Sequence, residues 1–309
     1  MILKTPIQIF LLIVILLFPL TPSISFAVGI SIITSQDLPI YEQAFEGFKN
    51  IYKGETRRYD LQGNLRESEK VIRRIRDKPP DLIVAIGLLA ATVAKENFRE
   101  TPIVFCAVVD TERFSLVGDN LTGITLNVPV TETLSQIRNI LPEARKLGVL
   151  YDPRKSRLTI EQAENLGKTL GFSMIPQKVS SELALPDAMR SVLHKSDLLW
   201  IIPDSTIITP DSIDYIFLNT SEEHIPIITF SEDLLKKGAL AAVSPDYVSI
   251  GEQAGHLVLR ILSGKSPGTI PIQPADKTRV IINQRIAKKL GLKFNKTSVD
   301  IDTEVIFYE

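Results

Sequence analysis

The 309-residue sequence predicts an α/β protein built from two doubly wound parallel sheets. Short apolar runs rich in valine and isoleucine, such as DLIVAIG (81–87) and PIVFCAVVD (102–110), have the length of strands buried on both faces. Amphipathic stretches of helical length separate these runs along the chain, which is typical of a parallel sheet covered by helices on both sides.

The alternation of strand and helix occurs twice. In the first half we expect strands at 28–34, 81–87 and 102–110 and helices at 39–52, 67–77 and 89–98. In the second half we expect strands at 146–152, 172–179, 197–203 and 225–230 and helices at 131–141, 157–171, 185–195 and 210–224. The tail is expected to add a long helix at 244–264, extended segments at 269–283, a helix at 284–292 and an edge strand within 299–308.

The N-terminal segment has the features of a cleaved signal peptide. Lys4 precedes an almost unbroken apolar run at 7–20, and Ser25-Phe26-Ala27 places small residues at the two positions that a signal peptidase reads. A membrane anchor is the alternative, but a comfortable span needs about 20 apolar residues and two prolines interrupt the end of this run. We therefore expect removal of residues 1–27 and a periplasmic mature protein.

Composition argues against several classes of partner and chemistry. Lys and Arg total 35 against 36 for Asp and Glu, with no basic block, so we expect no nucleic-acid partner. The single cysteine, Cys106, lies in an apolar strand pattern and reads as a buried structural thiol. The three histidines are far apart, and phosphate-loop, dinucleotide-binding and nucleophile-elbow motifs are missing. We expect no metal, no cofactor and no enzyme activity.

Polar residues follow the predicted strands where each strand ends. Ligands of open parallel sheets bind outside the carboxyl ends of the strands. The candidates found in this way are Ser35, Gln36, Gly87, Leu88, Leu89, Asp110, Tyr151, Asp204, Ser205, Thr206, Phe230 and Ser231. Each group also has a local explanation as a helix cap or a turn, but two sheets that both present polar strand ends indicate a cleft.

Two longer motifs resemble a known family. LPEARKLGVLYDP (141–153) and KKGALAAVSPDYVSIGEQAG (236–255) together are similar to ABC transporter substrate-binding proteins of the tryptophan/tyrosine type. The resemblance covers nearly the whole mature chain and implies a type I periplasmic binding-protein fold, in which two lobes are joined by three crossings. The lobes implied are 28–125 plus 245–273 and 126–244 plus 274–309.

The resemblance also implies roles for the site residues. It adds Asn127 and Asp246, on the hinge side, to the candidates above. Serine hydroxyls and backbone N–H groups at a helix N-terminus would hold a carboxylate. Asp204 would hold an ammonium group, and Tyr151 and Phe230 would sandwich an apolar or aromatic side chain.

One departure from the family bears on the ligand. The family usually has Gly-Thr-Pro where this chain has Gly87-Leu88-Leu89, so a hydroxyl is lost and two leucines are gained. We expect a non-catalytic monomer that delivers a small ligand, amino-acid-like or more apolar, to an ABC permease. The alternatives are a periplasmic sensor that presents its closed form to a receptor or kinase and, less favoured, a periplasmic hydrolase.

Overall fold

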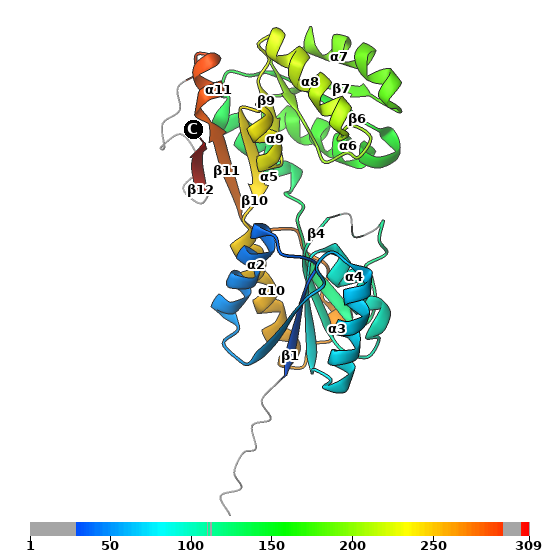
Figure 1. Ribbon diagram of the computed structural model, residues 1–309. Helices are drawn as coiled ribbons and strands as arrows, with labels where there is room; N and C mark the ends of the chain where they lie inside the picture. Colours follow the sequence, from blue (N-terminus) through cyan, green and yellow to red (C-terminus); the bar gives the residue numbers. More distant parts are fainter. Residues whose placement is uncertain (1–28, 110, 112, 293–303, 309) are drawn as a thin grey trace, which may run out of the picture.

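The computed structural model describes residues 29–292, apart from Asp110 and Glu112, and residues 304–308. The expected signal peptide at 1–27 therefore lies outside the described residues, as do positions 299–303 of the edge strand expected within 299–308. Figure 1 shows two lobes, one above the other, each with a sheet between layers of helices. The predicted α/β class with two doubly wound lobes is confirmed.

The first lobe contains a five-stranded sheet in which every strand runs parallel to its neighbours. Its order is β2 (Thr56–Asp60), β1 (Ile30–Thr34), β3 (Leu82–Ile86), β4 (Ile103–Val108) and β5 (Leu121–Thr125). One apolar cluster joins one face of this sheet to α2 (Pro39–Ile51) and α10 (Tyr247–Leu262). A second cluster joins the other face to α3 (Leu65–Asp77) and α4 (Leu88–Asn97).

The second lobe contains a seven-stranded sheet. Its order is β12 (Glu304–Tyr308), β11 (Thr278–Asn283), β10 (Ala241–Pro245), β9 (Ile227–Thr229), β8 (Leu198–Trp200), β6 (Lys146–Tyr151) and β7 (Ser173–Lys178). The strands from β10 to β7 are parallel, whereas β11 runs antiparallel to β10 and carries β12 beside it. The last two strands therefore make this sheet mixed.

Helices cover both faces of the second sheet as well. One apolar cluster involves α5 (Val130–Ile140), α6 (Pro153–Thr169) and α11 (Gln284–Lys289). The cluster on the other face involves α7 (Leu185–Leu193), α8 (Pro210–Glu222) and α9 (Glu232–Lys237). The helices begin where the sequence supplies caps: Asp152 accepts from Arg154 N–H at the start of α6, and Thr209 accepts from Ser212 N–H at the start of α8.

The chain passes between the lobes at three places: between β5 and α5, between β10 and α10, and just before β11. Neighbouring crossings are joined by backbone hydrogen bonds. Asp246 N–H donates to the Lys277 carbonyl over 3.0 Å, and Thr125 N–H donates to the Gln273 carbonyl over 2.8 Å. We propose the lobe division implied by the family resemblance, with these crossings as its hinge.

Helices α2 and α10 approach each other very closely. A Cβ built on Gly47 would lie 1.9 Å from the Val248 carbonyl oxygen, and one built on Gly251 would lie 1.9 Å from the Ala44 carbonyl oxygen. These glycines let the two backbones touch, which fixes α10 against the first lobe immediately after the chain crosses into it. Within the described residues, no helix is both long and apolar enough to cross a bilayer.

Candidate functional site

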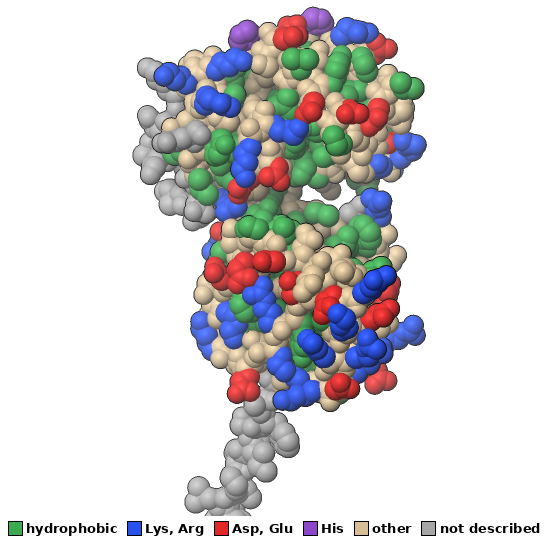
Figure 2. Space-filling model, in the orientation of Figure 1, with side chains coloured by type: hydrophobic (Ala, Val, Ile, Leu, Met, Phe, Trp, Pro, Cys, Tyr) green, Lys and Arg blue, Asp and Glu red, His purple; other side chains and the backbone are tan. Residues whose placement is uncertain are grey.

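The carboxyl-terminal edges of the two sheets face each other. Strand β5 leads directly into the first crossing, so the parallel strands of the first lobe point towards the second. Strand β10 leads into the crossing that reaches α10, so β6, β8, β9 and β10 point towards the first lobe. Figure 2 shows that the surface is hollowed between the lobes and that hydrophobic side chains gather on both sides of the hollow. This cleft is the candidate ligand site.

The first-lobe wall is built around the turn that connects β3 to α4. The Ser35 hydroxyl, at the end of β1, accepts a hydrogen bond from Ala90 N–H over 3.0 Å and so caps α4. Gly87 has a φ of 90°, which favours glycine, and a Cβ there would lie 2.6 Å from the Ser35 hydroxyl and 2.7 Å from the Tyr41 ring. Ser35, Gly87 and Tyr41 therefore form one tight unit at this edge.

The leucines of this wall are half-buried. Leu88 and Leu89 open α4 and pack partly against the apolar cluster shared with α3. Because they are the first two residues of the helix, their N–H groups have no acceptor within it. The wall thus combines partly exposed hydrocarbon with two backbone donors at the positive end of the α4 dipole.

Next to this wall, β4 contains an irregularity that was not predicted. Its register against β5 shifts between Phe105 and Val108, and Ala107 has a φ of 56°. Such bulges re-aim the end of a strand and occur often beside binding sites. Cys106, in the same stretch, is fully buried, and burial raises the pKa of its thiol to about 12, so it is not a reactive group.

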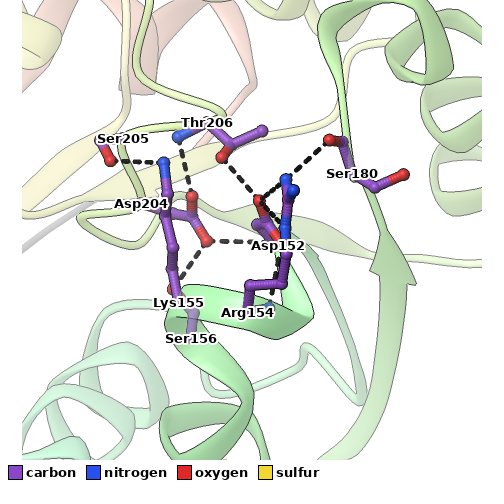
Figure 3. A network of polar contacts seen from close by, with 8 residues as sticks. All are labelled: Asp152, Arg154, Lys155, Ser156, Ser180, Asp204, Ser205 and Thr206. Atoms are coloured by element: carbon purple, nitrogen blue, oxygen red, sulfur yellow. Dashed lines mark hydrogen bonds and ion pairs between the residues drawn. The ribbon is translucent and has the colours of Figure 1, made fainter.

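In the second lobe, Asp204 lies at the centre of a polar network (Figure 3). Its side chain is 1% exposed. Oδ2 accepts from Asp152 N–H over 2.8 Å and from the Ser156 hydroxyl over 2.7 Å, and Oδ1 accepts from Thr206 N–H over 2.9 Å. These bonds join the loop after β8 to the end of β6 and the first turn of α6.

Asp152 completes this network. It is fully buried, it forms an ion pair with Arg154, and it accepts from the Thr206 hydroxyl over 2.8 Å. The hydrogen bond from the Arg154 side chain holds the pKa of the Asp152 carboxyl well below its usual range, with further help from the Arg154 backbone N–H. Asp152 therefore stays ionised as the cap of α6.

Asp204 and Thr206 are thus committed to the protein itself. We expected Asp204 to hold the ammonium group of a ligand, but its burial and its three hydrogen bonds argue instead for a structural role. Ser205 differs from both neighbours because it is exposed and accepts from Lys155 Nζ over 2.7 Å. Of these three loop residues, Ser205 is the most exposed to solvent.

The two aromatic candidates of the second lobe are not brought together. Tyr151 is 7% exposed and packs in the cluster that contains α5 and α6. Phe230 is half-buried against the cluster on the opposite face of the sheet. Burial raises the pKa of the Tyr151 phenol, and nearby Glu164 and Glu161 raise it further. The expected sandwich of a ligand between these two rings does not fit this arrangement.

The remaining candidates have varied surroundings. Ser231 caps α9 by accepting from Leu234 N–H over 3.4 Å, and Asp246 caps α10 by accepting from Ser249 N–H over 3.0 Å. Gln36 and Asn127 are exposed, the first after β1 and the second at the first crossing. Asp110 lies outside the described residues.

A charged and aromatic cluster at the cleft edge was not predicted. Arg279, the second residue of β11, forms an ion pair with Glu232, the first residue of α9. The guanidinium carbon of Arg279 lies 5.2 Å from the centroid of the Tyr247 ring, which packs on the first-lobe core. One signal could have found it: Arg279 is the only charged residue in the otherwise apolar or neutral strand TRVIIN.

The tyrosines at this edge are partly buried. Burial raises the pKa of Tyr247, whereas Arg279 opposes that rise. Burial also raises the pKa of Tyr41, and Cys106 adds to it. Tyr41, Tyr247, Leu88 and Leu89 give the first-lobe side aromatic and apolar character, and the second lobe contributes the Arg279–Glu232 pair.

A separate pocket lies at the far edge of the second lobe. It has a volume of about 40 Å³ and is lined by residues of α8, the start of β9 and α11, among them Phe217, His224 and Lys289. A space of this size holds no more than a few waters. It also lies at the amino-terminal edge of the sheet, away from the cleft.

Comparison with known families gives one match over most of the chain. The family model described as "ABC transporter substrate binding protein" matches residues 43–306. Among curated relatives, the "Tyrosine-binding protein" of Clostridioides difficile (strain R20291) is 28% identical over 279 residues, which cover 85% of this chain and 80% of the relative.

Solved structures are similar over nearly the whole chain. The ligand-free, open structure of a substrate-binding protein with adhesive properties from Clostridium difficile has a TM-score of 0.73 at 22% identity, covering 91% of this chain and 99% of that one. An ABC domain from Streptococcus pneumonia in complex with L-Trp has a TM-score of 0.58 at 20% identity, covering 90% of this chain and 100% of the other. These likenesses concern the fold.

Proposed function

Because the chain belongs to the ABC transporter substrate-binding protein family, we propose that it captures one small organic ligand between its lobes and delivers it to an ABC permease. The observation that carries this proposal is the pair of facing carboxyl-terminal sheet edges, with a hollow between them. Ligands of open α/β sheets bind at such edges. The expected signal peptide at 1–27 supports a periplasmic site of action. We propose that the mature chain works as a monomer.

We propose an amino acid with an aromatic or large apolar side chain as the ligand. The name of the 28% identical relative, a tyrosine-binding protein, supports this class. The first-lobe wall supports it independently, because Tyr41, Tyr247 and the two leucines of α4 offer hydrocarbon and ring faces.

Closure of the lobes follows from where the ligand binds. A ligand in the cleft contacts one wall in the open state and both walls in the closed state, so its binding shifts the population towards the closed form. The three crossings are the natural place for that motion, because each is short and they are the only described segments that connect the lobes.

Native mass spectrometry of freshly purified mature protein tests this function first. We expect a single non-covalent adduct that has the mass of an amino acid and is lost on denaturation. A lipid, sugar or nucleotide adduct would contradict the proposed ligand class. Conversion of the released compound into a product by fresh protein would contradict a non-catalytic role.

Titration provides the second readout. An amino acid that binds the folded state alone stabilises it by about 2.7 kcal/mol when its concentration is a hundredfold above the dissociation constant. We therefore expect a concentration-dependent rise in melting temperature with L-tyrosine or L-tryptophan and no rise with glucose. An equal rise with all amino acids, charged ones included, would argue against a specific cleft.

A further inference from the structure

The ion pair at the cleft edge contains an unusual buried donor. The Arg279 side chain is 12% exposed, and its Nη2 pairs with Oε1 of Glu232. Its Nε is buried and has no hydrogen-bond partner among the described residues. Buried guanidinium donors normally have an acceptor, because leaving an N–H of a charged group without one costs more free energy than losing an ordinary hydrogen bond. Among the described residues, none supplies the acceptor that this Nε calls for.

Glu232 is more accessible than its partner. Its side chain is 41% exposed, and its second oxygen, Oε2, has no hydrogen bond to another described residue. Glu232 is also the first residue of α9, where a negative charge is favourable. The pair thus presents one unsatisfied donor and one unsatisfied acceptor of opposite charge next to each other.

The position of the pair fits a ligand head group. Arg279 stands near the start of β11, beside the crossing that precedes it, and Glu232 follows the carboxyl end of β9, so both lie at the edge that faces the first lobe. Tyr247 of the first lobe lies 5.2 Å from the guanidinium and places an aromatic face at the same point. A ligand at this point would have its charged end on the second lobe and its apolar body towards Tyr41, Leu88 and Leu89.

From these contacts we infer that Arg279 and Glu232 together recognise the zwitterionic head of an α-amino acid. This deepens the proposed function and rests on it. The ligand carboxylate accepts from Arg279, including the orphaned Nε, and the ligand ammonium donates to Glu232. The four charges then alternate in sign, which a ligand with only a carboxylate or only an amine cannot achieve. The pair is a specificity determinant for molecules that carry both groups.

Three compounds with the same phenol ring distinguish the contribution of the ligand carboxylate to binding from that of the ligand ammonium. Isothermal titration calorimetry would compare L-tyrosine, tyramine, which lacks the carboxylate, and 3-(4-hydroxyphenyl)propanoate, which lacks the amine. For the unaltered protein we expect L-tyrosine to bind more tightly than either analogue by about tenfold to a hundredfold, the range of one hydrogen bond to a charged group.

Substitutions then assign each charge to its partner. Glu232→Gln should weaken L-tyrosine by about tenfold to a hundredfold while leaving 3-(4-hydroxyphenyl)propanoate as tight or tighter. Arg279→Met should weaken L-tyrosine and the propanoate but leave tyramine unchanged. Arg279→Lys keeps the positive charge but loses the planar guanidinium, so its affinity for L-tyrosine should lie between those of Arg279→Met and the unaltered protein. Because Glu232 is partly exposed, its glutamine variant should remain folded, which keeps the test informative if Arg279→Met unfolds.

The first lobe offers a matched control pair. Arg58 forms an ion pair with Glu42, and its guanidinium lies 4.2 Å from the Phe45 ring. Glu42→Gln and Arg58→Met should leave the order of the three affinities unchanged. Tight binding of L-tyrosine that neither Arg279→Met nor Glu232→Gln alters would overturn the head-group inference alone. Failure of all three compounds to bind the unaltered protein would overturn the proposed aromatic amino-acid function, and the inference with it.

Discussion

Replacing Asp204 with alanine is expected to lower the free energy of unfolding by about 4 kcal/mol, because breaking a buried charged network leaves its partners unpaired. Three donors lose their acceptor: Asp152 N–H, the Ser156 hydroxyl and Thr206 N–H. These groups join the ends of β6 and β8 to the start of α6, and the space left by the carboxylate is buried. Urea unfolding followed by the fluorescence of Trp200, which lies in β8, measures the loss.

Ser205→Ala is the matched control in the same loop. The Ser205 side chain is exposed, and among the described residues Lys155 is its one hydrogen-bond partner. The free energy of unfolding of the variant should therefore stay within about 0.5 kcal/mol of that of the unaltered protein. If Asp204→Ala leaves stability unchanged but weakens ligand binding more than tenfold, Asp204 faces the ligand after all. That result would restore the role suggested by the sequence pattern.

The second large effect is expected at the contact between α2 and α10. Gly251→Ala should lower the free energy of unfolding by about 3 kcal/mol, the upper end of what overpacking costs. The new methyl group would lie 1.9 Å from the Ala44 carbonyl oxygen and 2.7 Å from Phe48 N, which are backbone atoms that cannot rotate away. The helices would have to move apart, and the displacement would carry Tyr247, at the start of α10, with it.

Gly118→Ala is the control that tests whether the stability lost in Gly251→Ala comes from the contact between α2 and α10. A Cβ at Gly118 would meet its nearest neighbour, the Asn120 side chain, at 3.5 Å, which is ordinary van der Waals contact. Gly118→Ala should therefore unfold at nearly the same urea concentration as the unaltered protein. Equal midpoints for Gly251→Ala and Gly118→Ala would mean that the close approach of α2 and α10 adds little to stability.

Strands with continuous apolar runs could be predicted from the sequence, whereas polar strands could not. β3 and β4 were predicted within two residues of their observed bounds, because both faces of these strands are buried and the runs LIVAI and IVFCAV show it. β2 reads TRRYD, is partly exposed along its length and lies at the sheet edge, so it lacks an apolar signature. β5 reads LTGIT and β10 reads AAVSP, where threonine, glycine and proline masked buried strands.

The start of a helix could be predicted accurately only where its capping residue was recognised in the sequence. α8 begins at Pro210 as predicted, because Thr209 and Pro210 form a familiar N-terminal signal. α6 begins at Pro153, four residues earlier than the predicted 157, because Asp152 is its cap rather than part of a turn.

The candidate site was predictable as a place but not as a set of side chains. Strand ends locate the cleft because parallel strands bring their carboxyl ends to one edge. A cap and a ligand contact use the same residue types, however, so Asp204 could not be told apart from a ligand-facing carboxylate until its burial was known. Arg279, Glu232 and Tyr247 come from three separate elements, and their proximity depends on the crossings, which no local pattern contains.

Small-angle X-ray scattering tests the central claim, that the lobes close on a ligand in the cleft. The protein would first be freed of carried-over solute by unfolding and refolding, and then measured without and with a saturating amino acid that raises its melting temperature. The account predicts a smaller radius of gyration and a shorter maximum dimension in the bound state. A scattering curve that stays unchanged, in a sample whose raised melting temperature proves binding, would contradict it.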